Sequence, residues 1–203
     1  MLRLHFAPRS RAVRIAWMLE EMGVHYDLVS YALGDPAMRS PGFRAAVHPM
    51  GRVPVLEDGD VRIMESGAIL EYLLARHGDG QFRPAVDSAN YPAYLQWLHY
   101  SEGMLMPQVN SYMVETFFLP PERQSEVHAK RAKKLLGQML GPVNAALDGR
   151  DYLAGSFSAA DIMTGSAAIT ARGIGIDLSE RPALAAYIDR LEARPAYQTA
   201  ANL

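Results

Sequence analysis

The chain has 203 residues, a length that suits either one domain or two compact ones. Its formal net charge of −2 gives no electrostatic case for binding nucleic acid or an anionic membrane. It contains no cysteine, which excludes disulfides, thiolate metal sites and a thiol nucleophile of the protein's own. Any sulfur chemistry must therefore use a thiol that a ligand brings in.

Short strand-like and helical segments alternate in the first part of the chain. Apolar runs predict strands over residues 2–6, 26–31, 53–56 and 61–64, with a hairpin turn at Asp58-Gly59 joining the last two. Helical spacing of apolar residues predicts helices over 10–22, ended by Gly23, and over 66–77, capped by Ser66. Residues 32–50 are rich in Pro and Gly and leave room for one short helix at most. Residues 1–79 are therefore predicted to form a small α/β domain.

The second part of the chain contains no convincing strand. Gly and Pro residues mark a linker over residues 80–87, and residues 88–203 follow as an all-α domain. Helices are expected over 88–118, broken at Pro107, and over 122–147, which Pro142 should bend or end early. Ser158 and Asp161 are spaced like a helix-capping box, and Pro182 opens a last helix that ends near Arg194. No secretion signal or membrane span is predicted, so the cytoplasm is the expected location.

Four segments of the chain, in this order, resemble the cytosolic glutathione transferase family. They are the segment from Pro8 to Gly23, His48-Pro-Met-Gly-Arg-Val-Pro-Val-Leu56, Met64-Glu-Ser-Gly-Ala-Ile-Leu-Glu-Tyr72, and Tyr152-Leu-Ala-Gly-Ser-Phe-Ser-Ala-Ala-Asp-Ile162. Each motif is weak alone, but their combination is specific and extends over almost the whole chain. The resemblance implies a thioredoxin-like N-terminal domain, a helical C-terminal domain and a homodimer.

The resemblance also implies a glutathione site in the first domain. A cis Val53–Pro54 bond would turn the Val53 backbone toward the cysteinyl backbone of glutathione, which would pair as an added strand does. Ser66 would bind the γ-glutamyl carboxylate at a helix N-terminus, and Glu65 would face the α-amino group. Arg52 and His48 would lie near the glycyl carboxylate, although His48 replaces the asparagine that is usual in the family.

The group that activates the thiol is a separate question. A free thiol has a pKa of about 8.5, so a transferase must stabilise the thiolate. Ser10 is the candidate hydroxyl donor, and its alternative role is a plain helix cap. In several classes of the family the active residue directly precedes the proline of this segment, a position that Ala7 occupies here. Backbone amides and the helix dipole are the remaining candidates for activation.

An electrophile pocket is expected between the domains. Candidate lining residues are Tyr100, Met104, Met106 and Tyr112, although Met and Tyr at helical spacing are typical of a core as well. The predicted function is transfer of glutathione to a small hydrophobic electrophile, with no metal. Two alternatives remain: another glutathione-dependent reaction, such as peroxide reduction, dehalogenation or isomerisation, or a weakly catalytic binding module. The absence of cysteine excludes the family's cysteine-type thiol transfer.

Overall fold

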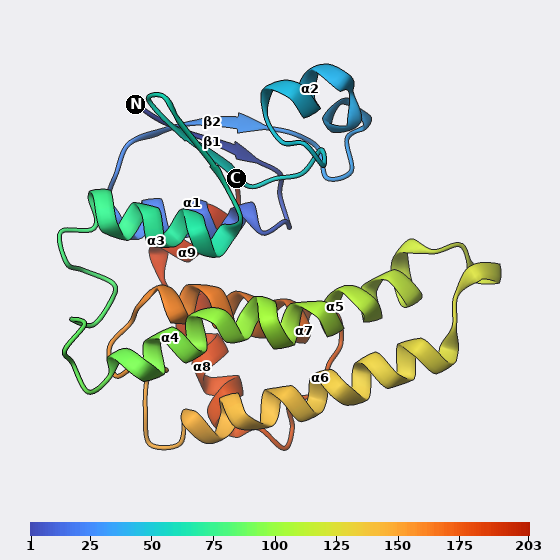
Figure 1. Cartoon of the computed structure of the whole chain (residues 1–203). Helices are drawn as coiled ribbons and strands as arrows, with labels where there is room; N and C mark the ends of the chain where they lie inside the picture. Colours follow the sequence, from blue (N-terminus) through green and yellow to red (C-terminus); the bar gives the residue numbers. More distant parts are fainter. The chain divides into compact units, whose positions relative to one another are not determined.

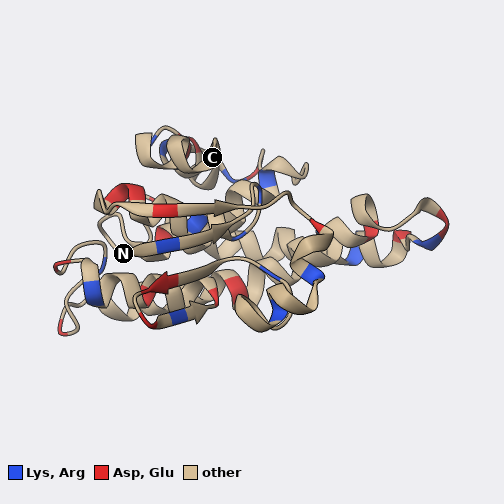
Figure 2. Cartoon of the chain, turned by 90° about the horizontal axis from the view of Figure 1, so that it is seen from above, with Lys and Arg blue, Asp and Glu red and all other residues tan.

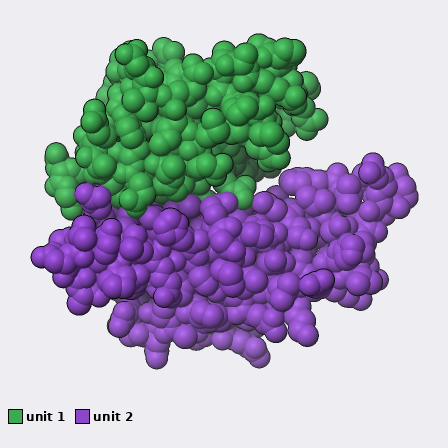
Figure 3. Space-filling view, viewed as in Figure 1, with its two compact units in different colours: residues 1–81, 192–203 green, residues 82–191 purple.

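The computed structural model describes residues 1–203, which divide into two compact units (Figure 3). Unit 1 comprises residues 1–81 together with residues 192–203, and unit 2 comprises residues 82–191. The sequence placed residues 80–87 in a linker and residues 88–203 together in the helical domain. The structure instead groups residues 192–203 with the α/β unit.

Unit 1 is built on a four-stranded mixed sheet. Its strands are β1 (Leu2–Phe6), β2 (Tyr26–Ser30), β3 (Val55–Asp58) and β4 (Val61–Met64), in the order β2-β1-β3-β4. Strand β1 runs parallel to β2 and antiparallel to β3, so Leu4 pairs with both Leu28 and Leu56. The predicted strands and the hairpin between β3 and β4 are confirmed. Strand β3 begins after Pro54, two residues later than predicted, because proline cannot donate to a sheet.

Helices α1 (Ala12–Met22) and α3 (Ser66–His77) pack against the sheet and against each other (Figure 1). Residues 14–19 of α1 are all buried, and Gly23 ends the helix in the left-handed conformation, as the sequence predicted. A short 3₁₀ helix (Pro36–Arg39) and α2 (Pro41–Ala46) occupy the segment that precedes β3. The thioredoxin-like architecture predicted for the first part of the chain is therefore confirmed.

Unit 2 is entirely helical. Its α-helices are α4 (Tyr91–Tyr100), α5 (Met106–Met113), α6 (Glu126–Ala146), α7 (Ser166–Gly173) and α8 (Pro182–Glu192), with π-helical turns over Ser101–Leu105, Val114–Phe118 and Asp161–Gly165 and a 3₁₀ turn over Pro121–Arg123. Helices α5 and α6 form a long antiparallel hairpin (Figure 1). Helix α6 continues through Pro142 to Ala146, so the prediction that this proline ends the helix early was wrong. None of the helices combines the length and apolar character that a membrane crossing needs.

Charge is distributed evenly over the molecule. Figure 2 shows acidic and basic residues interspersed along the chain. Exposed pairs of opposite sign recur, including Lys130 with Glu126 on α6 and Arg172 with Asp189. The near-neutral net charge therefore reflects charges of both signs that are mixed along the chain.

The buried carboxylate of Asp161 organises one end of unit 2. It accepts hydrogen bonds from the Leu153 and Ser158 backbone N–H groups at 3.0 and 2.9 Å, and from the Ser158 and Tyr187 hydroxyls at 3.0 and 2.9 Å. Burial raises the pKa of the Asp161 carboxyl, and the four donated hydrogen bonds oppose that shift. The side chain is fully enclosed, so Asp161 has the structural role that the capping-box spacing predicted.

We expect His5 to make stability depend on pH. The ring is buried on β1, with Nδ1 2.9 Å from the Tyr31 hydroxyl oxygen and Nε2 3.4 Å from Glu57 Oε1. Burial lowers the pKa of His5, so the fold favours the neutral ring, and its contribution is present above the unfolded pKa of about 6.5 and lost as pH falls below it. The free energy of unfolding should fall less between pH 7.5 and 5.5 in His5→Gln than in the unmodified chain. Equal falls measured by urea titration would contradict this.

Candidate functional site

The N-terminus of α3 carries two of the predicted residues. The helix begins at Ser66 itself, so Glu65 occupies the capping position, with a backbone φ of 73°. The first backbone N–H groups of a helix have no intrahelical acceptor, and they carry partial positive charge. A left-handed φ is uncommon for a residue with a side chain and is frequent at functional sites. The expectation that Ser66 caps the helix was therefore one position out.

A buried arginine reaches the same place from α1. Arg14 Nη1 donates a hydrogen bond to Ser66 Oγ at 3.2 Å, and both residues are only 3% exposed. The guanidinium adds a full positive charge beside the partial charge of the α3 N-terminus. Together these groups form an environment suited to a carboxylate. Sequence reasoning missed Arg14, although a charged residue inside the buried face of a predicted helix was the available signal.

The backbone of Val53 is open for pairing. The Val53–Pro54 peptide bond is cis, as the sequence interpretation favoured. Strand pairing of β3 begins only at Val55, opposite His5, and neither the N–H nor the C=O of Val53 makes a backbone hydrogen bond. An exposed N–H and C=O at the end of a strand can pair with an extended peptide.

The loop before Val53 places His48 and Arg52 near Glu65. His48 is buried and its Nδ1 accepts a hydrogen bond from the Met50 N–H at 3.0 Å. Burial lowers the pKa of His48, nearby Glu65 opposes this and Arg52 reinforces it, so all three groups lie within electrostatic range. Arg52 and Glu65 are exposed and have no ion-pair partner in the structure. They are therefore available for a zwitterionic ligand.

Gly51 fixes the path of this loop. It adopts a φ of 64°, and a Cβ at this position would collide with the Met38 carbonyl oxygen. Only glycine satisfies both requirements without a shift of the neighbouring backbone. The glycine in the motif from His48 to Leu56 thus brings His48 and Arg52 to the same edge of unit 1.

Ser10 lies in the turn between β1 and α1. Its hydroxyl donates to the Ala7 carbonyl at 2.7 Å and accepts from the Ala12 N–H at 3.1 Å. The capping position of α1 is Arg11, so Ser10 forms a serine turn one residue before the cap. The Ser10, Val13 and Arg14 N–H groups also donate within this turn. The turn thus holds Ser10 in place, and its hydroxyl proton is directed at a carbonyl oxygen.

The predicted electrophile-pocket residues differ in their surroundings. The Tyr100 hydroxyl donates to the Met139 carbonyl at 2.9 Å, and Met106 is buried in the core of unit 2. These contacts give both residues a packing role. Met104 is 41% exposed, and the half-buried Tyr112 ring meets Phe117 edge-on at 6.3 Å between centroids. Met104 and Tyr112 therefore keep surface that a ligand can contact.

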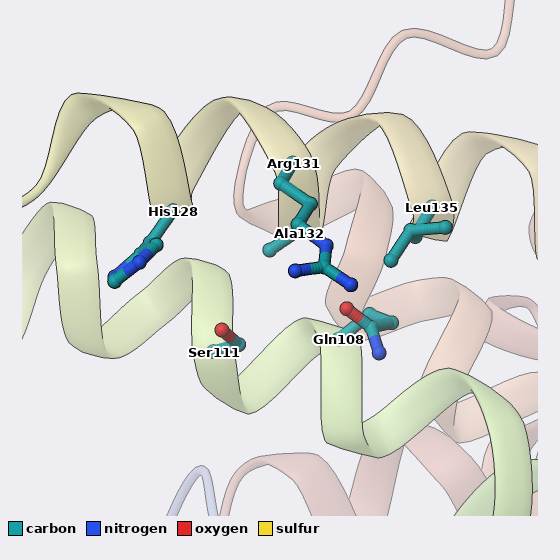
Figure 4. A pocket seen from close by; sticks show the side chains of 6 residues that line it. All are labelled: Gln108, Ser111, His128, Arg131, Ala132 and Leu135. Carbon is teal, nitrogen blue, oxygen red and sulfur yellow. The ribbon is translucent and has the colours of Figure 1, made fainter.

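Two cavities are present, and none of these residues lines either of them. One, of about 210 Å³, lies between α5 and α6 in unit 2 (Figure 4) and is lined by Gln108, Ser111, His128, Arg131, Ala132 and Leu135. The other, of about 470 Å³, lies in unit 1 beside the end of α1 and is lined by Leu19, Glu20, Gly23, Val24, His25, Tyr26, Leu28 and Leu203. Cavity shape alone would not have located the cluster around Ser66, which hydrogen bonding and backbone geometry identify. No cluster of three or more potential metal-ligating side chains is present.

Comparison with known proteins identifies the family. Residues 2–75 match the model of the glutathione S-transferase N-terminal domain, and residues 106–195 match that of the C-terminal domain. Glutathione S-transferase 3 of Schizosaccharomyces pombe is 34% identical over 79% of this chain and 70% of its own length. Glutathione S-transferase 3 of Zea mays is 30% identical over 97% of this chain and 91% of its own length.

Solved structures agree with these sequence matches. A glutathione S-transferase from Actinobacillus pleuropneumoniae superposes with a TM-score of 0.82 at 27% identity, covering 100% of this chain and 92% of its own. A glutathione transferase from Pseudomonas putida, crystallised with one glutathione disulfide per subunit, gives a TM-score of 0.89 at 25% identity, covering 100% and 91%. Both domain models, curated relatives and structural neighbours thus agree, and the chain belongs to the cytosolic glutathione S-transferase family as an enzyme of that class.

Proposed function

We propose that unit 1 binds glutathione and that the protein joins the glutathione sulfur to a small hydrophobic electrophile, so that the whole glutathionyl group is transferred. The observation that carries the proposal is the open Val53 backbone on the same unit as the Ser66–Arg14 pair at the α3 N-terminus. An extended anionic peptide is the ligand that uses both features at once. The relatives named as glutathione transferases support the same ligand.

Each part of glutathione has a matching group in this arrangement. The γ-glutamyl carboxylate accepts from Ser66 and the first N–H groups of α3, and Glu65 pairs with the α-amino group. The cysteinyl backbone pairs with Val53, and this pairing holds the cysteinyl residue, with its thiol, beside the loop that precedes Val53. The glycyl carboxylate lies toward Arg52, whose planar guanidinium can donate two hydrogen bonds to it. His48 holds the loop through the Met50 N–H.

The thiol is activated through the Ser10 hydroxyl. A hydroxyl hydrogen rotates about its C–O bond, so Ser10 can donate to a thiolate while it still accepts from the Ala12 N–H. Rotation gives up the bond to the Ala7 carbonyl, which is worth about 1 kcal/mol. Lowering a thiol pKa by one to two units is worth roughly 1.4–2.7 kcal/mol. A hydrogen bond to a charged acceptor is worth about 1.5–3 kcal/mol, more than the bond that is lost, so the Ser10 geometry is compatible with activation.

In the reaction, the glutathione thiolate attacks an electrophilic carbon. A sulfur–carbon bond forms, and the bond from that carbon to its leaving group breaks, with the electron pair departing on the leaving group. The thiol proton passes to solvent, so no external oxidant or reductant is required. The exposed parts of Met104 and Tyr112 are the candidates for apolar contact with the electrophile.

A weakly catalytic glutathione-binding module is the second candidate. It is favoured by a specific observation, because the Ser10 hydroxyl donates to Ala7 and Ala7 occupies the position before Pro8. In this alternative glutathione binds through Ser66, Val53 and Arg52 while its thiol keeps its ordinary pKa. The two candidates differ in activation and share the binding site.

The proposal further includes a homodimer, the assembly that the resemblance to the family implies. Sedimentation equilibrium should give a mass near twice the 22.4 kDa of the chain. A monomer at micromolar concentration would contradict this part of the proposal alone.

Calorimetric titration tests the binding proposal. Glutathione should bind, and cysteinylglycine, which lacks the γ-glutamyl group, should bind far more weakly. Conjugation of glutathione to 1-chloro-2,4-dinitrobenzene, followed by absorbance, then separates enzyme from module. Absence of glutathione binding would contradict the proposal, and binding without conjugation across a panel of electrophiles would favour the module.

A further inference from the structure

The end of the described chain returns to unit 1. Helix α9 (Pro195–Ala201) packs along α1, and the pair has one of the most extensive helix–helix contacts in the molecule (Figure 1). Ala200 of this helix is fully buried. Residues 194–201 are thus integral to the α/β unit although the helical unit precedes them in sequence.

Two contacts hold this segment on α1. Arg194 forms a bidentate pair with the Glu21 carboxylate: Nε donates to Oε1, and Nη2 donates to Oε2 at 2.8 Å. The Trp17 indole N–H donates to the same carboxylate at 2.8 Å. The Tyr197 ring meets the fully buried Trp17 ring edge-on, with centroids 4.9 Å apart. A bidentate arginine–carboxylate pair fixes the relative orientation of the two side chains more strictly than a single hydrogen bond does.

Arg14, Trp17 and Glu21 share one face of α1. They stand at positions i, i+3 and i+7, which lie above one another on an α-helix. Trp17 and Glu21 are contacted by residues 194–201, whereas Arg14 donates a hydrogen bond to Ser66 on α3. A shift or roll of α1 against α9 therefore moves Arg14 relative to Ser66.

The Arg14–Ser66 contact is sensitive to such a shift. At 3.2 Å it lies at the long end of the range for an N–H···O hydrogen bond, and both groups are buried. A few tenths of an ångström would break it, and no bulk water is there to replace it. Placement of α1 consequently decides whether the guanidinium reaches Ser66.

We infer that Arg194 and Tyr197 are positioning residues for glutathione, because they fix the face of α1 that carries Arg14. The inference rests on the proposed function, since it concerns the same carboxylate site. Both residues act through α1, since Arg194 bonds Glu21 and Tyr197 contacts Trp17. Their effect passes through one rigid helix of 11 residues.

The experiment uses the full chain with Tyr197→Ala, Tyr197→Phe and Arg194→Lys. Calorimetry at a temperature at which every variant is folded should show glutathione binding weakened about 5- to 10-fold in Tyr197→Ala. Tyr197→Phe retains the ring and should restore most of the affinity. Arg194→Lys loses the two-pronged geometry and should weaken binding several-fold. Gln198→Ala, an exposed change on the same helix, is the matched control and should leave affinity unchanged.

A double-mutant cycle separates positioning from general destabilisation. In a Ser66→Ala background, Tyr197→Ala should have no further effect on glutathione affinity, because the contact it protects is already absent. A lowered melting temperature with unchanged affinity in Tyr197→Ala and Arg194→Lys would overturn the inference. So would a full Tyr197→Ala effect that persists in the Ser66→Ala background. Failure of the unmodified chain to bind glutathione would instead contradict the proposed function.

Discussion

Replacement of Asp161 by alanine is expected to lower the free energy of unfolding by about 3–5 kcal/mol, measured by urea denaturation followed by circular dichroism. The carboxylate accepts four hydrogen bonds in a fully buried position, from two backbone N–H groups and from the Ser158 and Tyr187 hydroxyls. Its removal leaves these donors without an acceptor and without water. A loss of this size is a large fraction of the stability of an ordinary domain.

Two further variants make the expectation specific. Asp161→Asn keeps one acceptor oxygen but turns an amide N–H₂ group toward hydrogen-bond donors. Its free energy of unfolding should therefore lie between those of Asp161→Ala and the unmodified chain. Asp189→Ala removes an exposed carboxylate of the same unit that pairs with Arg172, and should cost less than about 1 kcal/mol. The structural role of Asp161 would be refuted by a cost no greater than that of Asp189→Ala.

Replacement of Ser66 by alanine should weaken glutathione binding about 10- to 30-fold. The hydroxyl that the proposal directs at the γ-glutamyl carboxylate is lost, and the buried Arg14 guanidinium loses its 3.2 Å acceptor. One charge-assisted hydrogen bond is worth about 1.5–3 kcal/mol, and the lower part of this range, about 1.5–2 kcal/mol, corresponds to the expected change in affinity. Titration calorimetry of glutathione against the purified variant measures it.

Ser30→Ala is the matched control for this change. Ser30 is an exposed serine of β2 in the same unit, so its substitution should leave glutathione affinity unchanged. Cysteinylglycine supplies a second control, because it lacks the carboxylate in question and should be insensitive to Ser66→Ala. Equal affinities of Ser66→Ala and the unmodified chain for glutathione would remove Ser66 from the site.

Sequence patterns predicted most of the fold because its local signals agree with its tertiary structure. Gly23 ends α1, and the capping-box spacing of Ser158 and Asp161 appears as direct hydrogen bonds. The hairpin forms as predicted, with its turn at Gly59-Asp60, one residue after the predicted Asp58-Gly59. Of the two effects predicted for Pro142, early termination is wrong: α6 continues past it, with Leu140 and Val143 buried on either side. Helix α9 was not predicted because it is short and its contact partner on α1 lies far away in the sequence.

Residues of the candidate site could be proposed from the sequence only where they belong to a motif. Val53, Glu65 and Ser66 belong to linear segments that resemble the family, and the structure gives each of them an unusual backbone or buried environment. Arg14 was missed because its role depends on Ser66, which lies 52 positions away. The role of Tyr100 was also ambiguous, because its hydrogen-bond acceptor, the Met139 carbonyl, lies on another helix and far away in the sequence.

Titration of the bound thiol tests the central claim most directly, through the ultraviolet absorbance of the glutathione thiolate as a function of pH. The account predicts that glutathione bound to the unmodified chain titrates one to two units below the free value of about 8.5. Ser10→Ala should bind glutathione with nearly the same affinity and return the pKa of the bound thiol toward the free value. A bound thiol that titrates at the free pKa in the unmodified chain would contradict activation by Ser10 and leave a binding module.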